Sequence, residues 1–273
     1  MTRAKRIPRA WLELLVIAAG IFFAQSNWAA QGREIRVAAA ADLKLAMAEL
    51  VNKFESNSHT TVSVSYGSSG NFFAQIQNGA PFDVFLSADI EYPRKLEAAG
   101  SAEPGTLFEY AAGRIVIWMP PEINADVRKQ GWNALLDPAV RKIAIANPDH
   151  APYGRAAVAA LQKAGIYEQV KSKLVLGENI SQAAQFVQSG NAQAGILAKS
   201  LMLSPEMKNG QVWEIPRELH PPIEQGAMVL KSARNKQGAL EFLDFLKSDS
   251  GQRILEKYGF VVPRRISAVP AQP

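Results

Sequence analysis

Short apolar segments with strand character alternate along this chain with longer segments of helical period. Residues 35–40 form the first apolar segment, and between Asp42 and Phe54 apolar residues recur at steps of three and four. The same alternation returns at residues 61–76 and again at residues 143–163. Strands that alternate with amphipathic helices indicate an α/β fold, so we predict mostly parallel sheets flanked by helices.

Further apolar segments divide the chain into two predicted lobes. Strands are expected at residues 81–87, 115–119, 143–146, 194–197 and 226–230, and late helices at 236–247 and 249–257. Proline pairs at 120–121 and 221–222 lie near two crossovers. We therefore predict that lobe 1 consists of residues 33–112 plus 228–263, and that lobe 2 consists of residues 113–227.

The N-terminal segment has the pattern of a secretory signal peptide. Four basic side chains precede an apolar run at residues 12–24 that is too short for a comfortable membrane span. Small residues follow, and we place the cleavage site after Ser26, with an upper limit at residue 30. Because Glu13 interrupts the apolar run, an uncleaved anchor is the alternative. We expect a periplasmic protein that is soluble once residues 1–26 are removed.

Charge and cysteine content exclude several classes of function. Residues 1–26 carry four basic and one acidic side chain, so their removal lowers the formal net charge from +5 to +2. No basic face for nucleic acid stands out after processing. The chain has no cysteine, which excludes disulfides, thiolate metal sites and a cysteine nucleophile. The three histidines are far apart in polar or proline-bearing loops, which argues against a bare metal ion: His59, His150 and His220.

The segment from Ser65 to Asn71 places hydroxyl groups and glycines between a strand pattern and a helix pattern. A helix that begins at Ser68 or Ser69 has unpaired backbone N–H groups and a positive end, and an oxyanion can satisfy both. The alternative is that one of these serines only caps the helix. Junctions of the same kind follow three other predicted strands. Since ligands collect at strand ends in open α/β sheets, we predict that four junctions converge on one cleft.

Four stretches together resemble a known family. They are Val37–Leu43, Ser68–Ser69, Gly79–Asp89 and Tyr258–Phe260, and the combination resembles the periplasmic molybdate- and tungstate-binding proteins of ABC importers. The resemblance implies a two-lobed periplasmic-binding-protein fold of type II with a two-strand hinge. It also implies a monomer without cofactor or catalytic residues. Such a protein closes on molybdate or tungstate, with molybdenum entering as the oxyanion, and delivers it to an ABC permease driven by a cytoplasmic ATPase.

Matching positions imply which residues bind the anion. The resemblance places ligand contacts at Asp42, Ser69, Tyr153 and Ile180, the last through its backbone. Some members bind with a tyrosine at the position that is Ala198 here, and we expect Tyr153 to replace that hydroxyl. No lysine or arginine stands at these positions. The implied site therefore holds a dianion through neutral donors and helix ends.

Asp42 departs from the pattern because a carboxylate has no proton to donate at neutral pH and repels a dianion. We prefer the hypothesis that its side chain caps its own helix and that only its backbone N–H faces the ligand. In the alternative, Asp42 faces the ligand and selects an anion that carries its own proton, such as hydrogen phosphate.

Two other functions remain as alternatives. The first is a receptor for another small oxyanion such as phosphate. The second is an exported serine hydrolase that uses Ser68 or Ser69 with His150 and Asp149. The serine turn lacks the G-x-S-x-G spacing, and the adjacent Asp149 and His150 are poorly placed for a relay. We therefore predict that the protein is not an enzyme.

Overall fold

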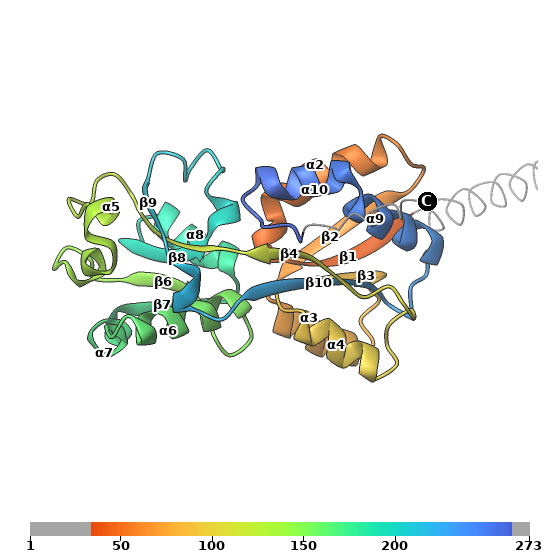
Figure 1. Cartoon of the computed structure of the whole chain (residues 1–273), viewed down its shortest axis with the longest axis horizontal. Helices are drawn as coiled ribbons and strands as arrows, with labels where there is room; N and C mark the ends of the chain where they lie inside the picture. The colour runs from red at the N-terminus through yellow and green to blue at the C-terminus, as the bar shows by residue number, and fades with distance from the viewer. Residues whose placement is uncertain (1–33, 264–273) are drawn as a thin grey trace, which may run out of the picture.

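The computed structural model describes residues 34–263 and arranges them as two lobes side by side (Figure 1). The predicted signal peptide at residues 1–26 lies outside the described residues. Within residues 34–263, none of the helices combines the length and apolar character needed to cross a membrane.

The first sheet contains strands from both ends of the described chain. Its order is β2 (Thr61–Gly67), β1 (Glu34–Ala40), β3 (Val84–Ser87), β10 (Ile223–Val229) and β4 (Phe108–Gly113). β1 pairs in parallel with β2 and β3, whereas β10 runs antiparallel to β3 and β4. Four of the five strands therefore run in the same direction and β10 alone is reversed, so the sheet is mostly parallel, as predicted, with one antiparallel strand.

Alternate side chains of β1 face two different helical layers. Ile35, Val37 and Ala39 are buried in one cluster, while Ala38 belongs to the cluster on the opposite face. This alternation follows from the two-residue period of a strand. The helices on one face are α2 (Lys44–Glu55), α9 (Lys236–Lys247) and α10 (Asp249–Lys257), and those on the other are α3 (Ser69–Gln77) and α4 (Glu91–Ala98) (Figure 1).

The second sheet repeats this plan. Its order is β7 (Leu174–Gly177), β6 (Ile143–Ala146), β8 (Ala194–Ala198), β5 (Ile115–Met119) and β9 (Gln211–Glu214). β6 pairs in parallel with β7 and β8, and β5 runs antiparallel to β8 and β9. The longer helices α6 (Pro152–Lys163) and α8 (Ile180–Gln188) lie on opposite faces (Figure 1). Short elements complete the described chain: α5 (Val127–Gln130), α7 (Tyr167–Val170), η1 (Ala41–Leu43), η2 (Gly131–Leu136), η3 (Lys171–Lys173), η4 (Lys199–Leu201) and η5 (Arg217–Leu219).

Two connections join the lobes. The chain leaves the first sheet at Gly113 and enters the second at Ile115, and it returns between the end of β9 at Glu214 and the start of β10. At the crossing, Glu214 forms ion pairs with Arg114 and with Lys199, the latter at 2.7 Å. These pairs tie the outgoing connection to the returning one.

β10 joins the first sheet earlier than the sequence predicted. Ile223 already pairs with Gly113, whereas the predicted strand began at residue 226 and the predicted lobe boundary lay at residue 228. The apolar pattern hides the first half of β10 because Glu224 and Gln225 interrupt it. Gln225 is nevertheless fully buried, since other side chains satisfy its amide.

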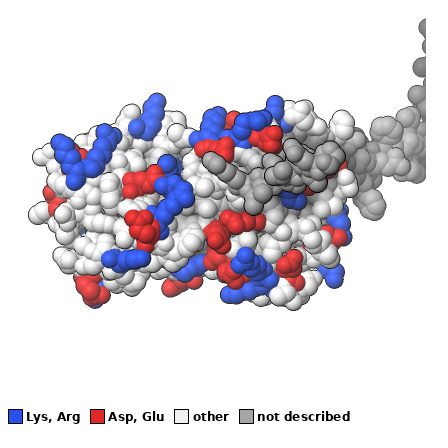
Figure 2. All heavy atoms as spheres, in the orientation of Figure 1, with Lys and Arg blue, Asp and Glu red and all other residues white. Residues whose placement is uncertain are grey.

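Charged side chains of both signs are interspersed over both lobes on the face shown in Figure 2. Several of them form exposed pairs, such as Lys257 with Glu49 at 2.6 Å and Arg94 with Glu91. Exposed pairs of this kind contribute little to stability. We therefore look for the functional site among the buried polar groups.

Candidate functional site

Asp42 lies at the carboxyl end of β1 and is fully buried. Its Oδ2 atom accepts hydrogen bonds from the Tyr153 hydroxyl at 2.9 Å and from Gln225 Nε2 at 2.7 Å. Its Oδ1 atom is buried without a hydrogen-bond partner among the described residues. Because Asp42 belongs to lobe 1 and Tyr153 to lobe 2, this carboxyl group joins the two lobes at their boundary.

Gln225 fixes the geometry around Asp42. Besides its bond to Asp42, its Nε2 atom lies 3.1 Å from the Tyr153 hydroxyl oxygen, and its Oε1 atom accepts a 2.6 Å bond from the Tyr110 hydroxyl. The exposed fractions of all four side chains are between 0 and 3 %. We call these four residues the inner cluster: Asp42, Tyr110, Tyr153 and Gln225.

Burial shifts the pKa values of the three titratable groups of the inner cluster. Burial raises the pKa of Asp42 from 3.8 to about 6, although hydrogen bonds from Gln225 and Tyr153, and then from the backbone N–H groups of Asp42 and Leu43, partly offset the effect. Burial, and then the nearby charge of Asp42, raise the pKa values of Tyr110 and Tyr153 well above their usual range. The donors to the Asp42 carboxyl group are neutral, so no cation compensates its charge.

The prediction that Asp42 caps its own helix is wrong. The chain passes through the η1 turn before α2 begins, and no side-chain capping bond is made at the start of either element. The carboxyl group instead bonds to Tyr153 and Gln225, which are 111 and 183 residues away in the sequence. Long-range partners outcompeted the local cap, and local sequence patterns contain no sign of them.

Ser69 is fully buried at the first position of α3. Its Oγ atom accepts a 2.8 Å bond from the backbone N–H of Ala88, which leaves its own hydroxyl proton available to an acceptor. Ser68 occupies the N-cap position but makes no side-chain capping bond, and its Oγ lies 2.9 Å from His150 Nδ1 in the other lobe. Neither serine serves as a side-chain cap for α3.

Ile180 is the first residue of α8 and is 3 % exposed. The next side chain, Ser181, donates a 2.8 Å bond to the carbonyl oxygen of Ala41, and Ser200 donates a 2.7 Å bond to the carbonyl oxygen of Asp42. These two bonds hold the start of α8 and the η4 turn against the end of β1. One apolar cluster contains Ala41, Ala88, Tyr153 and Ile180. Ala41 precedes Asp42 in the chain and the Ala88 backbone N–H bonds to Ser69 Oγ, so these two neighbours link Asp42 and Ser69 to the cluster.

A second set of contacts joins the lobes nearer to solvent. Arg155 donates to Asp89 at 2.6 Å and to the Tyr92 hydroxyl at 3.2 Å. The backbone N–H of Gly70 donates to the carbonyl oxygen of His150 at 2.9 Å. We call the three side chains joined by the Arg155 bonds the outer contacts: Asp89, Tyr92 and Arg155. With the inner cluster they hold the two lobes closed on each other.

Comparisons with known proteins identify the family. The family model for bacterial extracellular solute-binding proteins matches residues 35–261. The chain is 40% identical to the molybdate-binding protein ModA of Azotobacter vinelandii over 85% of this chain and 91% of that protein. It is 38% identical to ModA of Rhodobacter capsulatus over 96% and 99% of the two chains. The chain belongs to the bacterial extracellular solute-binding proteins.

A solved structure shares the fold of this solute-binding protein. The periplasmic molybdate-binding protein of Azotobacter vinelandii matches with a TM-score of 0.78 and 33% identity, and the alignment covers 84% of this chain and 100% of that chain. The two-lobed periplasmic-binding-protein fold predicted from the sequence is therefore confirmed.

The hydrolase hypothesis loses its support in this solute-binding protein. Ser68 and His150 are within hydrogen-bond distance, but the His150 Nε2 atom faces Glu178 Oε2 at 3.6 Å rather than Asp149. The Asp149 backbone N–H bonds to Asn147, which holds the turn locally. Its close relatives are binding proteins, so the prediction that the chain is not an enzyme is confirmed.

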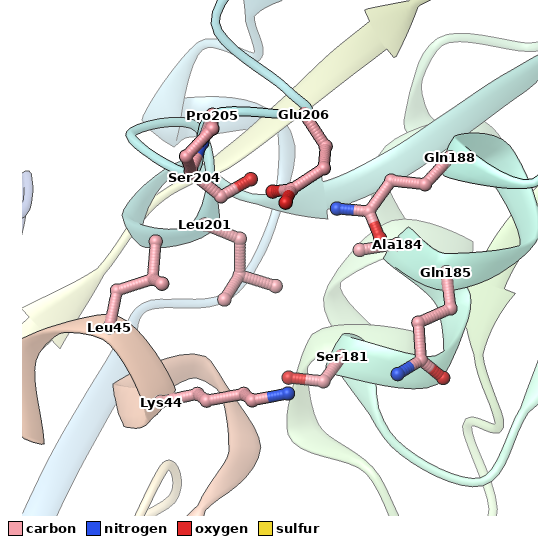
Figure 3. A pocket seen from close by; sticks show the side chains of 10 residues that line it. All are labelled: Lys44, Leu45, Ser181, Ala184, Gln185, Gln188, Leu201, Ser204, Pro205 and Glu206. Atoms are coloured by element: carbon pink, nitrogen blue, oxygen red, sulfur yellow. The ribbon is translucent and has the colours of Figure 1, made fainter. Parts of the chain in front are cut away.

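A separate pocket of about 340 Å³ opens beside the candidate site, between α2 and α8 (Figure 3). Lys44 and Ser181 line its floor, and Glu206 stands on the opposite wall (Figure 3). The Glu206 carboxylate would oppose an anion there, and none of the four predicted contact residues lines the pocket. We therefore assign the candidate anion site to the inner cluster and the neighbouring helix starts.

Sequence reasoning missed two members of the inner cluster. Tyr110 and Gln225 lie on β4 and β10, next to the lobe crossings, and neither was a candidate. The available signal was Gln225, a polar residue immediately before the small apolar residues of a buried strand. Buried polar side chains require partners, so such a residue indicates a buried network.

Proposed function

We propose that this solute-binding protein captures molybdate, or tungstate, between its lobes and presents it to an ABC permease with a cytoplasmic ATPase. Relatives that are 40% and 38% identical over most of the chain are named molybdate-binding proteins. We further propose that it works as a monomer in the periplasm after residues 1–26 are removed. The connection at Gly113 and the returning segment at residues 215–222 would act as the hinge.

The observation that carries the proposal is the meeting of helix starts from both lobes around the inner cluster. Ser69, Tyr153 and Ile180 lie in the first turns of α3, α6 and α8, where backbone N–H groups have no partner within the helix. The positive ends of three helices favour an anion at that point. The free hydroxyl proton of Ser69 supplies a further donor. These are neutral donors from two lobes, suited to enclose a small tetrahedral dianion.

Selectivity would come from size. Molybdate and tungstate have nearly the same radius, so this arrangement separates them poorly. Sulfate is smaller and leaves some donors stretched or unpaired, and each unpaired buried donor costs about 1–3 kcal/mol. Since about 1.4 kcal/mol is a factor of ten in affinity, two lost contacts would weaken sulfate binding by roughly 30- to 20,000-fold.

Calorimetric titration of the processed protein, stripped of bound anion, tests the proposal. We expect tight one-to-one binding of molybdate and tungstate, and weak binding of sulfate and phosphate. Ser69→Ala should weaken molybdate binding, whereas Ser56→Ala, at the exposed C-terminal end of α2, is the control that leaves the anion donors in place. Preference for phosphate or sulfate over molybdate would refute the proposal.

A further inference from the structure

The two oxygen atoms of Asp42 have unequal surroundings. Oδ2 accepts from both Tyr153 and Gln225, whereas Oδ1 is buried with no hydrogen-bond partner among the described residues. An ionised carboxylate spreads its charge over both oxygens and seeks donors at each. No side chain of the inner cluster therefore donates to Oδ1, and the only other groups that favour the ionised form are the nearby backbone N–H groups of Asp42 and Leu43, whose effect is weaker than those of Gln225 and Tyr153.

The groups packed against Asp42 cannot neutralise a negative charge. Tyr110 projects from β4, Tyr153 from α6 and Gln225 from β10, and Ser200 of η4 bonds to the Asp42 backbone carbonyl oxygen. All four are neutral. A dianion bound at the adjacent helix starts would therefore meet an unscreened like charge in a medium of low dielectric constant if Asp42 were ionised.

The only hydroxyl proton of Tyr153 is already engaged. It is donated to Asp42 Oδ2, while the same hydroxyl oxygen lies within hydrogen-bond distance of Gln225 Nε2. Tyr153 therefore has no side-chain proton for an anion in this arrangement. If a side chain of the inner cluster donates a hydrogen bond to the anion here, the donor must therefore be a proton on Asp42 Oδ1.

A protonated carboxyl group satisfies these requirements together. Its carbonyl-like Oδ2 accepts the two existing bonds, and a hydroxyl on Oδ1 becomes a donor that needs an acceptor. An oxygen of the bound anion is that acceptor. The environment already favours the neutral form, because burial raises the pKa of Asp42 to about 6, and a nearby dianion raises it further.

We propose that Asp42 binds the oxyanion as a neutral carboxylic acid, with Oδ2 held by Tyr153 and Gln225 and with Oδ1–H donating to an oxygen of the anion. Gln225 is then a positioning residue that determines which oxygen carries the proton. The inference rests on the proposed function and goes beyond it, because it makes capture of a dianion a proton-coupled event. The proton comes from solvent, remains on Asp42 and returns to solvent when the anion leaves.

The sign of the pH dependence follows from this scheme. Above about pH 6 the free protein has lost the Asp42 proton, whereas the complex keeps it, so binding takes up a proton. Affinity should therefore fall as the pH rises, by up to about tenfold for each pH unit. Below about pH 6 the free protein is already protonated, and this dependence should disappear.

Titration with molybdate, which is itself a dianion throughout this range, tests the proposal. We would measure affinity and proton uptake by calorimetry between about pH 6 and pH 8, in buffers with different ionisation enthalpies. The wild type should take up close to one proton per anion at the upper end. Asp42→Asn, whose amide keeps one acceptor and one donor, should take up none and should lose the pH dependence.

Asp89→Asn is the matched control, since Asp89 is a carboxylate that also joins the lobes but pairs with Arg155. It should retain the proton uptake of the wild type. Infrared difference spectra of the wild type, with and without molybdate, give a readout that needs no variant. A protonated carboxyl C=O band should appear on binding at about pH 8.

Two results separate this inference from the proposed function. Molybdate binding with no proton uptake and no carboxyl C=O band would overturn the inference and leave the receptor function standing. Absence of molybdate binding at every pH would overturn both. Retention of the full proton uptake in Asp42→Asn would also overturn the inference about Asp42, because another group would then carry the proton.

Discussion

The inner cluster and the outer contacts both join the lobes through a carboxylate of lobe 1, yet they differ in surroundings. Asp89 accepts a bond from the Arg155 guanidinium, and the two side chains are 27% and 39% exposed. Asp42 accepts bonds from neutral donors and is fully buried. The outer charge is paired and hydrated, and the inner charge is neither.

Burial, more than the number of hydrogen bonds, determines how a contact between the lobes responds to a bound anion. A half-exposed ion pair contributes about 0–1 kcal/mol and tolerates change. A buried carboxyl group without a counter-charge changes its protonation state instead. The inner cluster can therefore respond to an anion, while the outer contacts mainly guide closure.

The largest expected effect concerns stability. Asp42 keeps its proton up to about pH 6 in the folded protein but loses it near 3.8 when exposed, so stability falls as the pH rises across that window. Asp42→Asn removes this penalty. Its upper limit is on the order of 3 kcal/mol, and the actual value is smaller because opening of the lobes hydrates the carboxylate. In urea unfolding of the anion-free protein, Asp42→Asn should have a higher free energy of unfolding than the wild type at about pH 8, and nearly the same value at about pH 4. Equal gains at both pH values would contradict the account.

The next effect concerns the space around Tyr153. A Cβ atom at Gly113 would lie 2.2 Å from the Tyr153 hydroxyl oxygen and 2.9 Å from Gln225 Nε2. Gly113→Ala should therefore displace the hydroxyl from Asp42 and weaken molybdate binding by roughly 10- to 100-fold, as expected for 1–3 kcal/mol of lost pairing. Titration calorimetry measures the loss.

A double-mutant cycle sharpens this prediction. In a Tyr153→Phe background the hydroxyl is gone, so the additional cost of Gly113→Ala should be smaller than in the wild type. Equal costs in the two backgrounds would show that the glycine acts through the hinge backbone rather than through Tyr153.

Removal of the Tyr153 hydroxyl alone should have a smaller effect. Tyr153→Phe deletes one donor to Asp42 Oδ2 and leaves Gln225 in place, which costs about 1 kcal/mol, or roughly fivefold in affinity. Since that bond lowers the pKa of Asp42, its loss should raise the pKa and move the fall in affinity to higher pH. Molybdate affinity measured across the pH range tests this, and a fall in affinity that moved to lower pH would contradict the prediction.

The outer contacts should be the least sensitive. Arg155→Gln removes a half-exposed ion pair with Asp89, so molybdate affinity should change by less than about fivefold. Stopped-flow measurement of the association rate at low and high salt would detect the electrostatic part. A loss larger than that of Tyr153→Phe would reverse the ranking of the two regions.

Much of the fold could be predicted from local pattern. β5 and β6 occupy the predicted residues 115–119 and 143–146, and α9 and α10 occupy 236–247 and 249–257. Continuous apolar runs bounded by turns, and amphipathic periods with polar caps, are local signals. The first half of β10 was missed because its polar residues are satisfied only by side chains from elsewhere in the chain.

The candidate site was less accessible to sequence reasoning. The positions of Asp42, Ser69, Tyr153 and Ile180 came from a family resemblance, and their role as anion contacts remains a prediction. The orientation of the Asp42 side chain was predicted wrongly, because its partners lie in the other lobe and on the returning strand. Local sequence gives a cap preference but no information on a competitor more than a hundred residues away.

Anomalous diffraction from crystals grown with molybdate locates molybdenum itself and so shows directly where the anion binds. We expect one molybdenum peak between the lobes, with oxygens of the anion within about 3 Å of Ser69 Oγ, Asp42 Oδ1 and the Ile180 backbone nitrogen. A peak in the side pocket near Lys44, or one that leaves Asp42 Oδ1 without a contact, would contradict this expectation.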